Sequence, residues 1–136
     1  MSLSRLNAIF AVICLTTFPV ICSRKAAIIN QIQVEEYKNA SWKNKTDDNE
    51  IMVFHALAVD PLEKGKGCGR AFVAFYEDYA KQHGCTALHM DTNVLNTRAR
   101  NLYQRLGYEE IGIVESDFNG IPNVRLVCLE KTEMNL

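Results

Sequence analysis

Residues 51–72 read IMVFHALAVDPLEKGKGCGRAF, and this stretch decides the fold. The run 51–59 is almost continuously apolar, which predicts a strand that is buried on both faces. Asp60-Pro61 bounds this strand, and a glycine-rich loop follows it. From residue 69 the apolar residues recur at helical spacing, which predicts a helix over 69–84. The stretch therefore runs from a buried strand through a glycine loop into a helix.

The loop between this strand and this helix has the character of an anion site. The first turn of a helix carries N–H groups without intrahelical partners, and its macrodipole adds partial positive charge. Glycines let the backbone approach an anion because no Cβ intervenes. The loop supplies both glycines and countercharge, from Lys64, Gly65, Lys66, Gly67, Gly69 and Arg70.

Three nucleotide-binding patterns can be compared with this loop. A Walker loop ends in Gly-Lys-Ser/Thr, but here Gly69 is followed by Arg70 and Ala71. The dinucleotide fingerprint G-x-G-x-x-G also fails, because neither possible start places glycine at its last position. The third pattern, Arg/Gln-x-x-Gly-x-Gly/Ala, grips the pyrophosphate of coenzyme A. Residues 64–69 match it, with lysine in place of the leading residue.

The elements on either side complete an α/β (α+β) pattern. The residue patterns predict strands over 26–37, 86–92, 109–118 and 123–131, a second helix over 97–107, and a polar loop or hairpin turn over 43–50. Asn119-Gly120 supplies the positive φ angles of a hairpin between the last two strands. From residue 51 onward the expected order is strand, helix, strand, helix, strand, strand.

Composition excludes several classes of protein. The 136 residues suffice for a single domain, 1–136, and 48% hydrophobic with 23% charged residues is ordinary for a globular protein. A net charge of −1 argues against a dedicated nucleic-acid binder. Five cysteines without a C-x-x-C pair predict reduced thiols in a cytoplasmic protein, and neither a disulfide framework nor a zinc site. His83 and His89 lack partners at ligand spacing, so no metal is expected.

The N-terminal segment 1–25 is atypical. It is apolar from Ala8 to Cys22, which is shorter than the roughly 18 residues of a membrane span, and Pro19 interrupts it. A signal peptide is one reading, because a charged residue precedes the apolar stretch. The other reading is a buried helix or strand of the domain.

A second motif stands in register with the loop. Residues 96–108 read NTRARNLYQRLGY, which resembles Asn-x-x-Ala-x-x-Leu-Tyr followed by Gly-Phe or Gly-Tyr. Together the two motifs resemble those of the GNAT superfamily of N-acetyltransferases, over about residues 26–131. The resemblance implies a mixed, mostly antiparallel central sheet flanked by helices, in which the strands at 51–59 and 86–92 are parallel and splay apart. It also implies N-terminal elements that are shortened here.

The resemblance implies acetyl-CoA as cosubstrate and assigns residues to it. The backbone of the first splayed strand would hold the pantetheine arm and polarise the thioester carbonyl. The loop would hold the pyrophosphate, and the start of the second helix would bond the pantetheine or the cofactor beyond it. The cofactor-binding residues expected in this way are Leu57, Ala58, Val59, Lys64, Gly65, Lys66, Gly67, Cys68, Gly69, Arg70 and Asn96. Cys68 is expected to contact the cofactor as part of the loop and not as a nucleophile.

Transfer of the acetyl group requires two proton movements. Tyr103 matches the family's usual general acid, although it also lies on the apolar stripe of its helix. HALAV at 55–59 is similar to the same stretch of arylalkylamine N-acetyltransferases, which makes His55 the candidate base. A core histidine is the alternative. The glutamate of histone-type members has no match, because Ile51 stands at its place and Glu50 is one residue off.

Two functions of different class follow from the sequence. One is an enzyme that acetylates a primary amine, on a small molecule or a protein, by direct attack on acetyl-CoA. The other is a coenzyme A-binding module with little or no transferase activity, because only about 25 residues precede the family-like core. A homodimer could complete the acceptor site. A membrane location is not expected for a protein that uses acetyl-CoA.

Overall fold

The computed structural model describes residues 11–12, 25–31, 35–43, 47–59, 67–118 and 120–132. Its sheet has the strand order β1-β2-β3-β4-β6-β5. The strands are β1 (Ala11–Val12), β2 (Lys25–Asn30), β3 (Ile51–Val59), β4 (Ala87–Asn93), β5 (Glu109–Phe118) and β6 (Ile121–Lys131). β3 and β4 are parallel, and every other neighbouring pair is antiparallel. The predicted mixed, mostly antiparallel sheet is confirmed.

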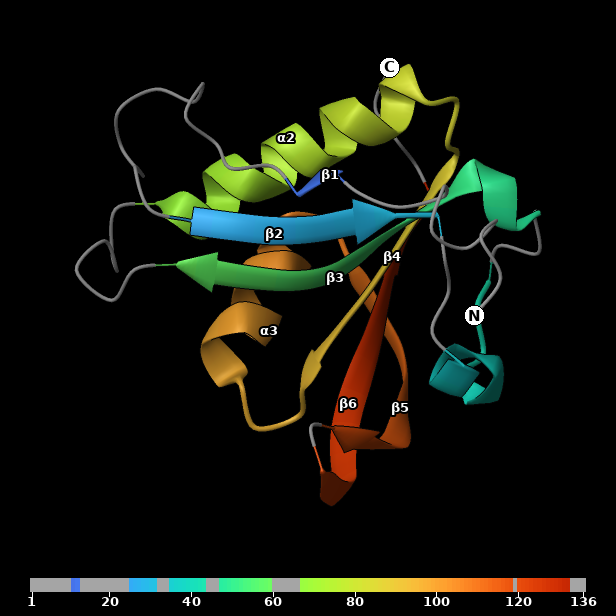
Figure 1. The fold of residues 1–136 in the computed structure, drawn as a ribbon, viewed down its shortest axis with the longest axis vertical. Coiled ribbons are helices and arrows are strands. Elements are labelled where there is room, and N and C mark those ends of the chain that lie inside the picture. The colour runs from blue at the N-terminus through green and yellow to red at the C-terminus, as the bar shows by residue number, and fades with distance from the viewer. Residues whose placement is uncertain are drawn as a thin grey trace.

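Two α-helices follow the two parallel strands, α2 (Cys68–Gln82) after β3 and α3 (Thr97–Arg105) after β4. Each ends where the sequence predicts. Gly84 and Gly107 have φ angles of 73° and 94°, a conformation that stops a helix because glycine adopts it without strain. Figure 1 shows α2 running alongside β2 and β3, with α3 near the place where β3 and β4 separate.

The sheet buries side chains on both faces. On one face Met52, Phe54, Leu88 and Met90 pack against the apolar stripes of α2 and α3. On the other face a second cluster gathers Ile51, Val53, Ala87, Cys128 and Tyr37. Strand side chains alternate between faces, so Met52, Phe54, Leu88 and Met90 meet the helices, whereas Ile51, Val53 and Ala87 meet the second cluster. The central strand β4 is consequently buried on both sides over Ala87–Met90.

The strand expected over 26–37 is shorter in the structure. β2 ends at Asn30, and the last three residues of that range belong to a 3-10 helix, η1 (Glu35–Asn39). The last ladder pair is Asn30 with Val53, and β3 begins at Ile51. A β2 that continued to Tyr37 would therefore run past the start of its partner strand, and Tyr37 is instead buried as part of η1. A second 3-10 helix, η2 (Asp48–Glu50), leads into β3.

The remaining elements agree closely with the sequence. β5 and β6 form an antiparallel hairpin that closes with Phe118 opposite Ile121, and Gly120 has a φ of 79°. β6 begins two residues earlier than expected, at Ile121 rather than 123. In the apolar N-terminal segment, Ala11–Val12 pairs with β2 as a strand. The rest of that segment lies outside the described residues.

Candidate functional site

The parallel strands β3 and β4 separate halfway along their length. Their ladder runs from Ile51 opposite Ala87 to Phe54 opposite Met90 and stops there. Beyond it β3 continues to Val59 paired only with β2, and β4 continues to Asn93 paired only with β6. The two facing backbone edges therefore have no strand partner among the described residues. Such edges can hydrogen-bond an extended ligand that carries amides of its own.

A β-bulge lies where the separation begins. On β2, Ile28 and Ile29 are consecutive, but their partners on β3 are Ala56 and Phe54. His55 is thus the extra residue of β3. A bulge bends its strand and increases the local twist, so it turns β3 away from β4. The backbone of His55 lies at the opening, whereas its side chain is outside the described part, so its expected role as a base stays a prediction.

The backbone expected to hold the pantetheine arm lies along the opening. Leu57, Ala58 and Val59 pair with β2 through one edge, and their other edge faces away from β2. This arrangement supports the expected cofactor contacts at these three positions, which remain predictions.

The N-terminus of α2 follows the opening. Its N-cap is Gly67, with φ 77° and ψ 21°, and no side chain caps the first turn. A residue with a Cβ is strained at this φ, so glycine is required for the chain to enter the helix at this angle. Arg70 is exposed in the first turn. The expected loop contacts at 64–66, and the side chain of Cys68, lie outside the described residues.

Gly69, expected to bind cofactor, has a clear packing role. A Cβ built on it would lie 2.9 Å from Cδ2 of Leu102, on α3. Glycine at this position therefore lets α2 and α3 approach closely. Because the two helices follow the two separating strands, this contact holds both sides of the opening in place. Sequence reasoning assigned the glycine to phosphate binding and missed the helix contact.

The start of α3 is fixed by Asn96. Its side-chain Oδ1 accepts a hydrogen bond from the N–H of Ala99 at 3.1 Å, so it caps the helix. Arg100 pairs with Glu110 at 2.8 Å and also donates to the carbonyl of Val94 at 2.8 Å. Asn96 is exposed, so the expected cofactor contact remains a prediction beside its capping role.

Tyr103 lies on α3 with 8% of its surface exposed. Burial, and then the charge of Asp91, raise the pKa of its phenol above the usual value of 10.0. The hydroxyl thus stays protonated throughout the neutral range and can donate a hydrogen bond. Tyr103 belongs to the helix-side core and is near enough to Asp91 for its phenol to feel that charge.

Asp91, which sequence reasoning missed, is the first residue of β4 beyond the paired segment. The hydroxyl of Tyr37 donates a hydrogen bond to its Oδ2 at 2.6 Å. Burial raises the pKa of the Asp91 carboxyl, the Tyr37 hydrogen bond lowers it, and the charge of Glu36 raises it. A signal was available, because a carboxylate directly after the apolar run ALHM stands at the end of a buried strand.

An aromatic and ionic cluster holds Tyr37 in place. Trp42 donates from Nε1 to the Tyr37 carbonyl at 2.8 Å and stacks on His89 at 3.7 Å between ring centroids. His89 Nε2 lies 2.9 Å from Glu130 Oε2, and both side chains are at most 2% exposed. Glu130 also accepts from the backbone N–H of Lys43 at 2.9 Å. His89 is therefore a packed, paired core residue.

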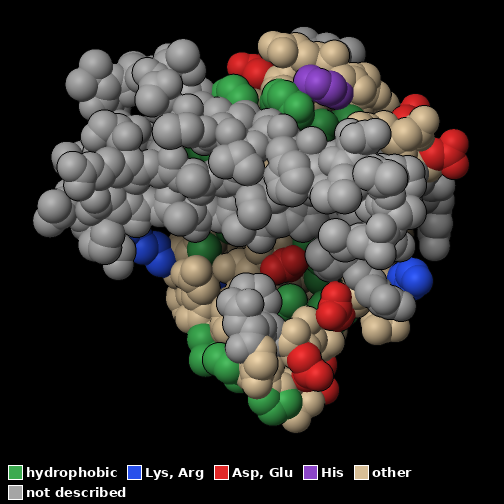
Figure 2. All heavy atoms as spheres, viewed as in Figure 1, with side chains coloured by type: hydrophobic (Ala, Val, Ile, Leu, Met, Phe, Trp, Pro, Cys, Tyr) green, Lys and Arg blue, Asp and Glu red, His purple; other side chains and the backbone are tan. Residues whose placement is uncertain are grey.

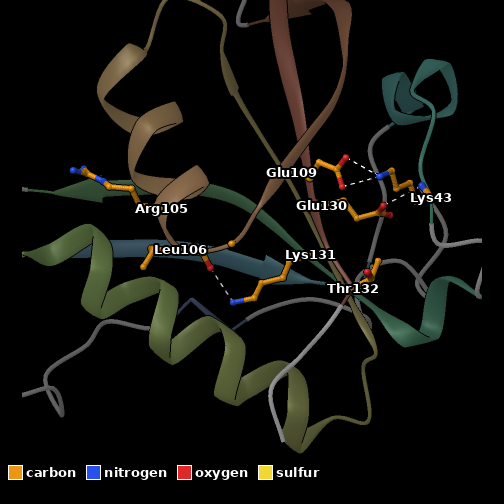
Figure 3. A pocket seen from close by; sticks show the side chains of 8 residues that line it. Lys43, Arg105, Leu106, Glu109, Glu130, Lys131 and Thr132 are labelled. Atoms are coloured by element: carbon orange, nitrogen blue, oxygen red, sulfur yellow. Dashed lines mark hydrogen bonds and ion pairs between the residues drawn. The ribbon is translucent and has the colours of Figure 1, made fainter.

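A polar pocket of about 570 Å³ lies at the other end of β4 (Figure 3). Its lining includes Lys131, whose Nζ lies 2.9 Å from both Glu77 and the Leu106 carbonyl, and Lys43, which pairs with Glu109 at 2.7 Å. Lys131 is opposite Leu88 near the start of β4, whereas the opening lies beyond Met90. These ion pairs connect β5 and β6 to Glu77 of α2 and to Lys43. The pocket is therefore separate from the opening.

Several other properties concern the described residues alone. No group of three or more His, Cys, Asp or Glu among them could hold a metal ion. No helix in the described ranges is long and apolar enough to cross a membrane. Cys85 and Cys128 are free and buried, and burial together with the charge of Asp91 raises the pKa of Cys128 to about 12. A nucleophilic role for Cys128 is therefore unfavourable.

Comparison with known proteins identifies relatives of this arrangement. A model of the acetyltransferase (GNAT) family matches residues 27–108. The uncharacterized N-acetyltransferase MJ1207 of Methanocaldococcus jannaschii is 31% identical over 77 residues, which are 57% of this chain and 34% of that protein. The uncharacterized N-acetyltransferase YhfO of Bacillus subtilis is 38% identical over 60 residues, 44% of this chain and 40% of that protein. The matched segment thus spans about a third to two fifths of the length of these curated relatives.

The fold has counterparts among solved structures. A Bacillus subtilis acetyltransferase solved in complex with CoA superposes with a TM-score of 0.57 at 18% identity, covering 80% of this chain and 68% of that one. At this identity the comparison concerns the fold alone. It shows that the two proteins share their overall fold over most of this chain.

Proposed function

Because the chain belongs to the acetyltransferase (GNAT) family, we propose that it transfers an acetyl group from acetyl-CoA to a primary amine. The observation that carries the proposal is the opening between β3 and β4, which leads directly to the uncapped, glycine-started N-terminus of α2. The opening suits an extended chain of amides, and the N-terminus of α2 suits an anion. Pantetheine and pyrophosphate are joined in that order in coenzyme A.

Different residues along the opening would bind different parts of the cofactor. The free edge of β3 at Leu57, Ala58 and Val59 would bond the pantetheine arm, and one of its N–H groups would polarise the thioester carbonyl. The loop from Lys64 to Arg70 would hold the pyrophosphate. A structure of a fold neighbour in complex with CoA is in keeping with this placement.

The chemistry would be direct attack of the acceptor amine on the thioester. The amine nitrogen bonds to the acetyl carbon, the carbon–sulfur bond breaks, and the thiolate leaves with a proton. Tyr103 is the proposed donor, because its raised pKa keeps the phenol protonated. A thiol has a pKa of about 8.5, so complete transfer from the phenol is uphill and a hydrogen bond to the forming thiolate is the main contribution. The HALAV resemblance implies His55, at the bulge, as one candidate for the base that takes the proton of the amine.

The acceptor is proposed to be cationic. Figure 2 shows acidic side chains on the lower part of the described surface, among hydrophobic ones, and further acidic side chains at the upper edge. Asp91 and Glu36 lie near enough for the charge of one to raise the pKa of the other. A primary ammonium carries the complementary charge. Use of acetyl-CoA also fits a cytoplasmic location.

A coenzyme A-binding module with little activity is the alternative function, and two measurements separate it from an enzyme. Calorimetric titration with CoA and acetyl-CoA should give saturable binding at one site. Release of thiol from acetyl-CoA should then depend on an added amine, tested with 2-phenylethylamine, spermidine and a lysine peptide. Binding without release would favour the module, and no binding of either CoA form would overturn both functions.

A further inference from the structure

We propose that Asp91 is the group that receives the proton of the acceptor ammonium. The proposal rests on the acetyl transfer proposed above and adds a catalytic residue to it. Four observations carry it: the place of Asp91 in the sheet, its hydrogen bond, the groups around it, and its relation to Tyr103.

Asp91 lies at the mouth of the opening. Met90 is the last residue of β4 that pairs with β3, and Asp91 is the next residue along the strand. Its backbone still pairs with Cys128 of β6, so a continuous ladder fixes its position. The residue is held by the sheet on one side and borders the opening on the other, which is the arrangement that a positioned catalytic group requires.

Within the described part of the chain, the carboxylate accepts one side-chain hydrogen bond. Tyr37 donates to Oδ2, at 2.6 Å, and Tyr37 is itself anchored through Trp42. A carboxylate has about four acceptor positions, so this bond leaves further ones for a donor such as an ammonium. The side chain keeps partial exposure, so an acceptor can approach it.

The groups that face Asp91 come from three elements. Tyr37 and Glu36 belong to η1, Cys128 belongs to β6, and Tyr103 belongs to α3. Burial, and after it the charge of Asp91, raise the pKa values of Tyr37, Tyr103 and Cys128 above their usual values. These three are neutral near pH 7, so the local charge there comes from the two carboxylates.

Asp91 and Tyr103 flank the opening from opposite faces of the sheet. Asp91 bonds Tyr37 in the second cluster, whereas Tyr103 packs in the helix-side core. A thioester lying in the opening would have its leaving sulfur toward the helix side and its attacking amine on the other. A proton acceptor on the amine side and a donor on the sulfur side match the two proton movements of the reaction.

Every proton in the proposed reaction is accounted for. Asp91 takes one proton from the ammonium, which frees the lone pair of the amine for attack on the acetyl carbon. As the carbon–sulfur bond breaks, the second proton passes from the nitrogen to the thiolate, directly or through the Tyr103 hydroxyl. Asp91 then releases its proton to solvent, and one proton is produced for each amide formed.

The test is the pH dependence of kcat/KM for Asp91→Asn, Tyr37→Phe and the wild-type protein, with acetyl-CoA and 2-phenylethylamine, spermidine or a lysine peptide. Asparagine still accepts the Tyr37 hydrogen bond, so the fold should be preserved, and thermal unfolding checks this. Asp91→Asn should lower kcat by about 10²–10⁴-fold and lose the acid limb of the wild-type profile. Its affinity for CoA should stay within about threefold of wild type.

Tyr37→Phe distinguishes catalysis from structure. The lost hydrogen bond normally lowers the pKa of Asp91, so the acid limb should move to higher pH while most of the rate at high pH remains. His55→Gln is measured in parallel. An unchanged profile in Asp91→Asn, or loss of the acid limb only in His55→Gln, would overturn the proposal while leaving acetyl transfer intact.

A measurement without turnover covers the case in which none of these amines is acetylated. Carboxyl ¹³C NMR would follow the titration of Asp91 in the CoA-bound protein, with and without 2-phenylethylammonium. 2-Phenylethylammonium should lower the pKa of Asp91, whereas the neutral analogue 2-phenylethanol, which carries no charge, should leave that pKa unchanged. Equal titration curves with and without 2-phenylethylammonium would reject the role of Asp91, independently of the proposed enzyme activity.

Discussion

Replacement of Gly69 by alanine tests whether this glycine serves helix packing or phosphate binding. The added Cβ would lie 2.9 Å from Cδ2 of Leu102, below the 3.4 Å at which ordinary contact begins. Leu102 must therefore shift by about 0.5 Å, and overpacking of this kind costs about 1–3 kcal/mol. Alanine returns at most about 1 kcal/mol in helix propensity. We expect a net loss of about 1 kcal/mol, or roughly 3–5 °C in Tm.

A double-mutant cycle with Leu102→Ala makes the expectation sharper. Leu102→Ala removes the methyl group that the new Cβ would meet, so only the gain in helix propensity remains. In that background Gly69→Ala should be neutral or stabilising by up to about 1 kcal/mol, which reverses its sign. Gly112→Ala is the matched control, because a Cβ there would meet nothing within 4 Å. Urea denaturation of the four variants and the wild type measures the coupling.

The same variants decide the role of Gly69 in binding. If the glycine serves packing alone, Gly69→Ala should keep its affinity for CoA within about threefold once unfolding is accounted for. The packing argument is refuted if Gly69→Ala loses stability equally in both backgrounds. It is also refuted if CoA affinity falls more than about tenfold while Tm is unchanged, because the phosphate would then approach the Cα itself.

Three further predictions concern the opening. Tyr103→Phe should keep CoA affinity and lower kcat at least about tenfold, as measured by thiol release, and a wild-type rate would return Tyr103 to a core role. Gly67→Val should abolish CoA binding and, because φ is 77°, lower stability by about 1–2 kcal/mol, whereas Gly67→Asn tolerates that φ better. Calorimetry measures CoA binding and thermal unfolding measures stability for both variants. Unchanged CoA binding in Gly67→Val would show that the phosphate lies elsewhere. The pKa of Asp91 is raised in the folded state, so its contribution to stability is complete below its unfolded pKa and is lost as pH rises through the folded value. Asp91→Asn should therefore have a higher Tm than wild type at pH 7, with a gap that narrows toward pH 4; a lower Tm at pH 7 would contradict this.

The order of elements could be predicted from residue 51 onward because local signals agree there. Apolar stripes place both helices, and Gly84, Gly107 and Gly120 end elements with positive φ angles, as the sequence indicates. Before residue 51 the agreement is weaker. The β-branched residues over 26–37 carry strand propensity, but the strand ends at Asn30, opposite Val53 and close to the start of its partner. The strand propensity of a segment carries no information about the length of its partner strand, so the 3-10 helix η1 could not be predicted from it.

The candidate site divides in the same way between local and long-range causes. Glycine-start and helix-cap positions such as Gly67 and Asn96 depend on a few neighbouring residues, and their motifs are visible in the sequence. The contact of Gly69 with Leu102 joins two helices, and the bond of Tyr37 to Asp91 joins residues 54 positions apart. Neither contact corresponds to a short sequence spacing, so no motif could have predicted it. Burial raises the pKa of the Asp91 carboxyl and thereby lowers the stability of the fold at neutral pH. A carboxylate with this cost in stability at the mouth of the opening is better explained by chemistry than by packing.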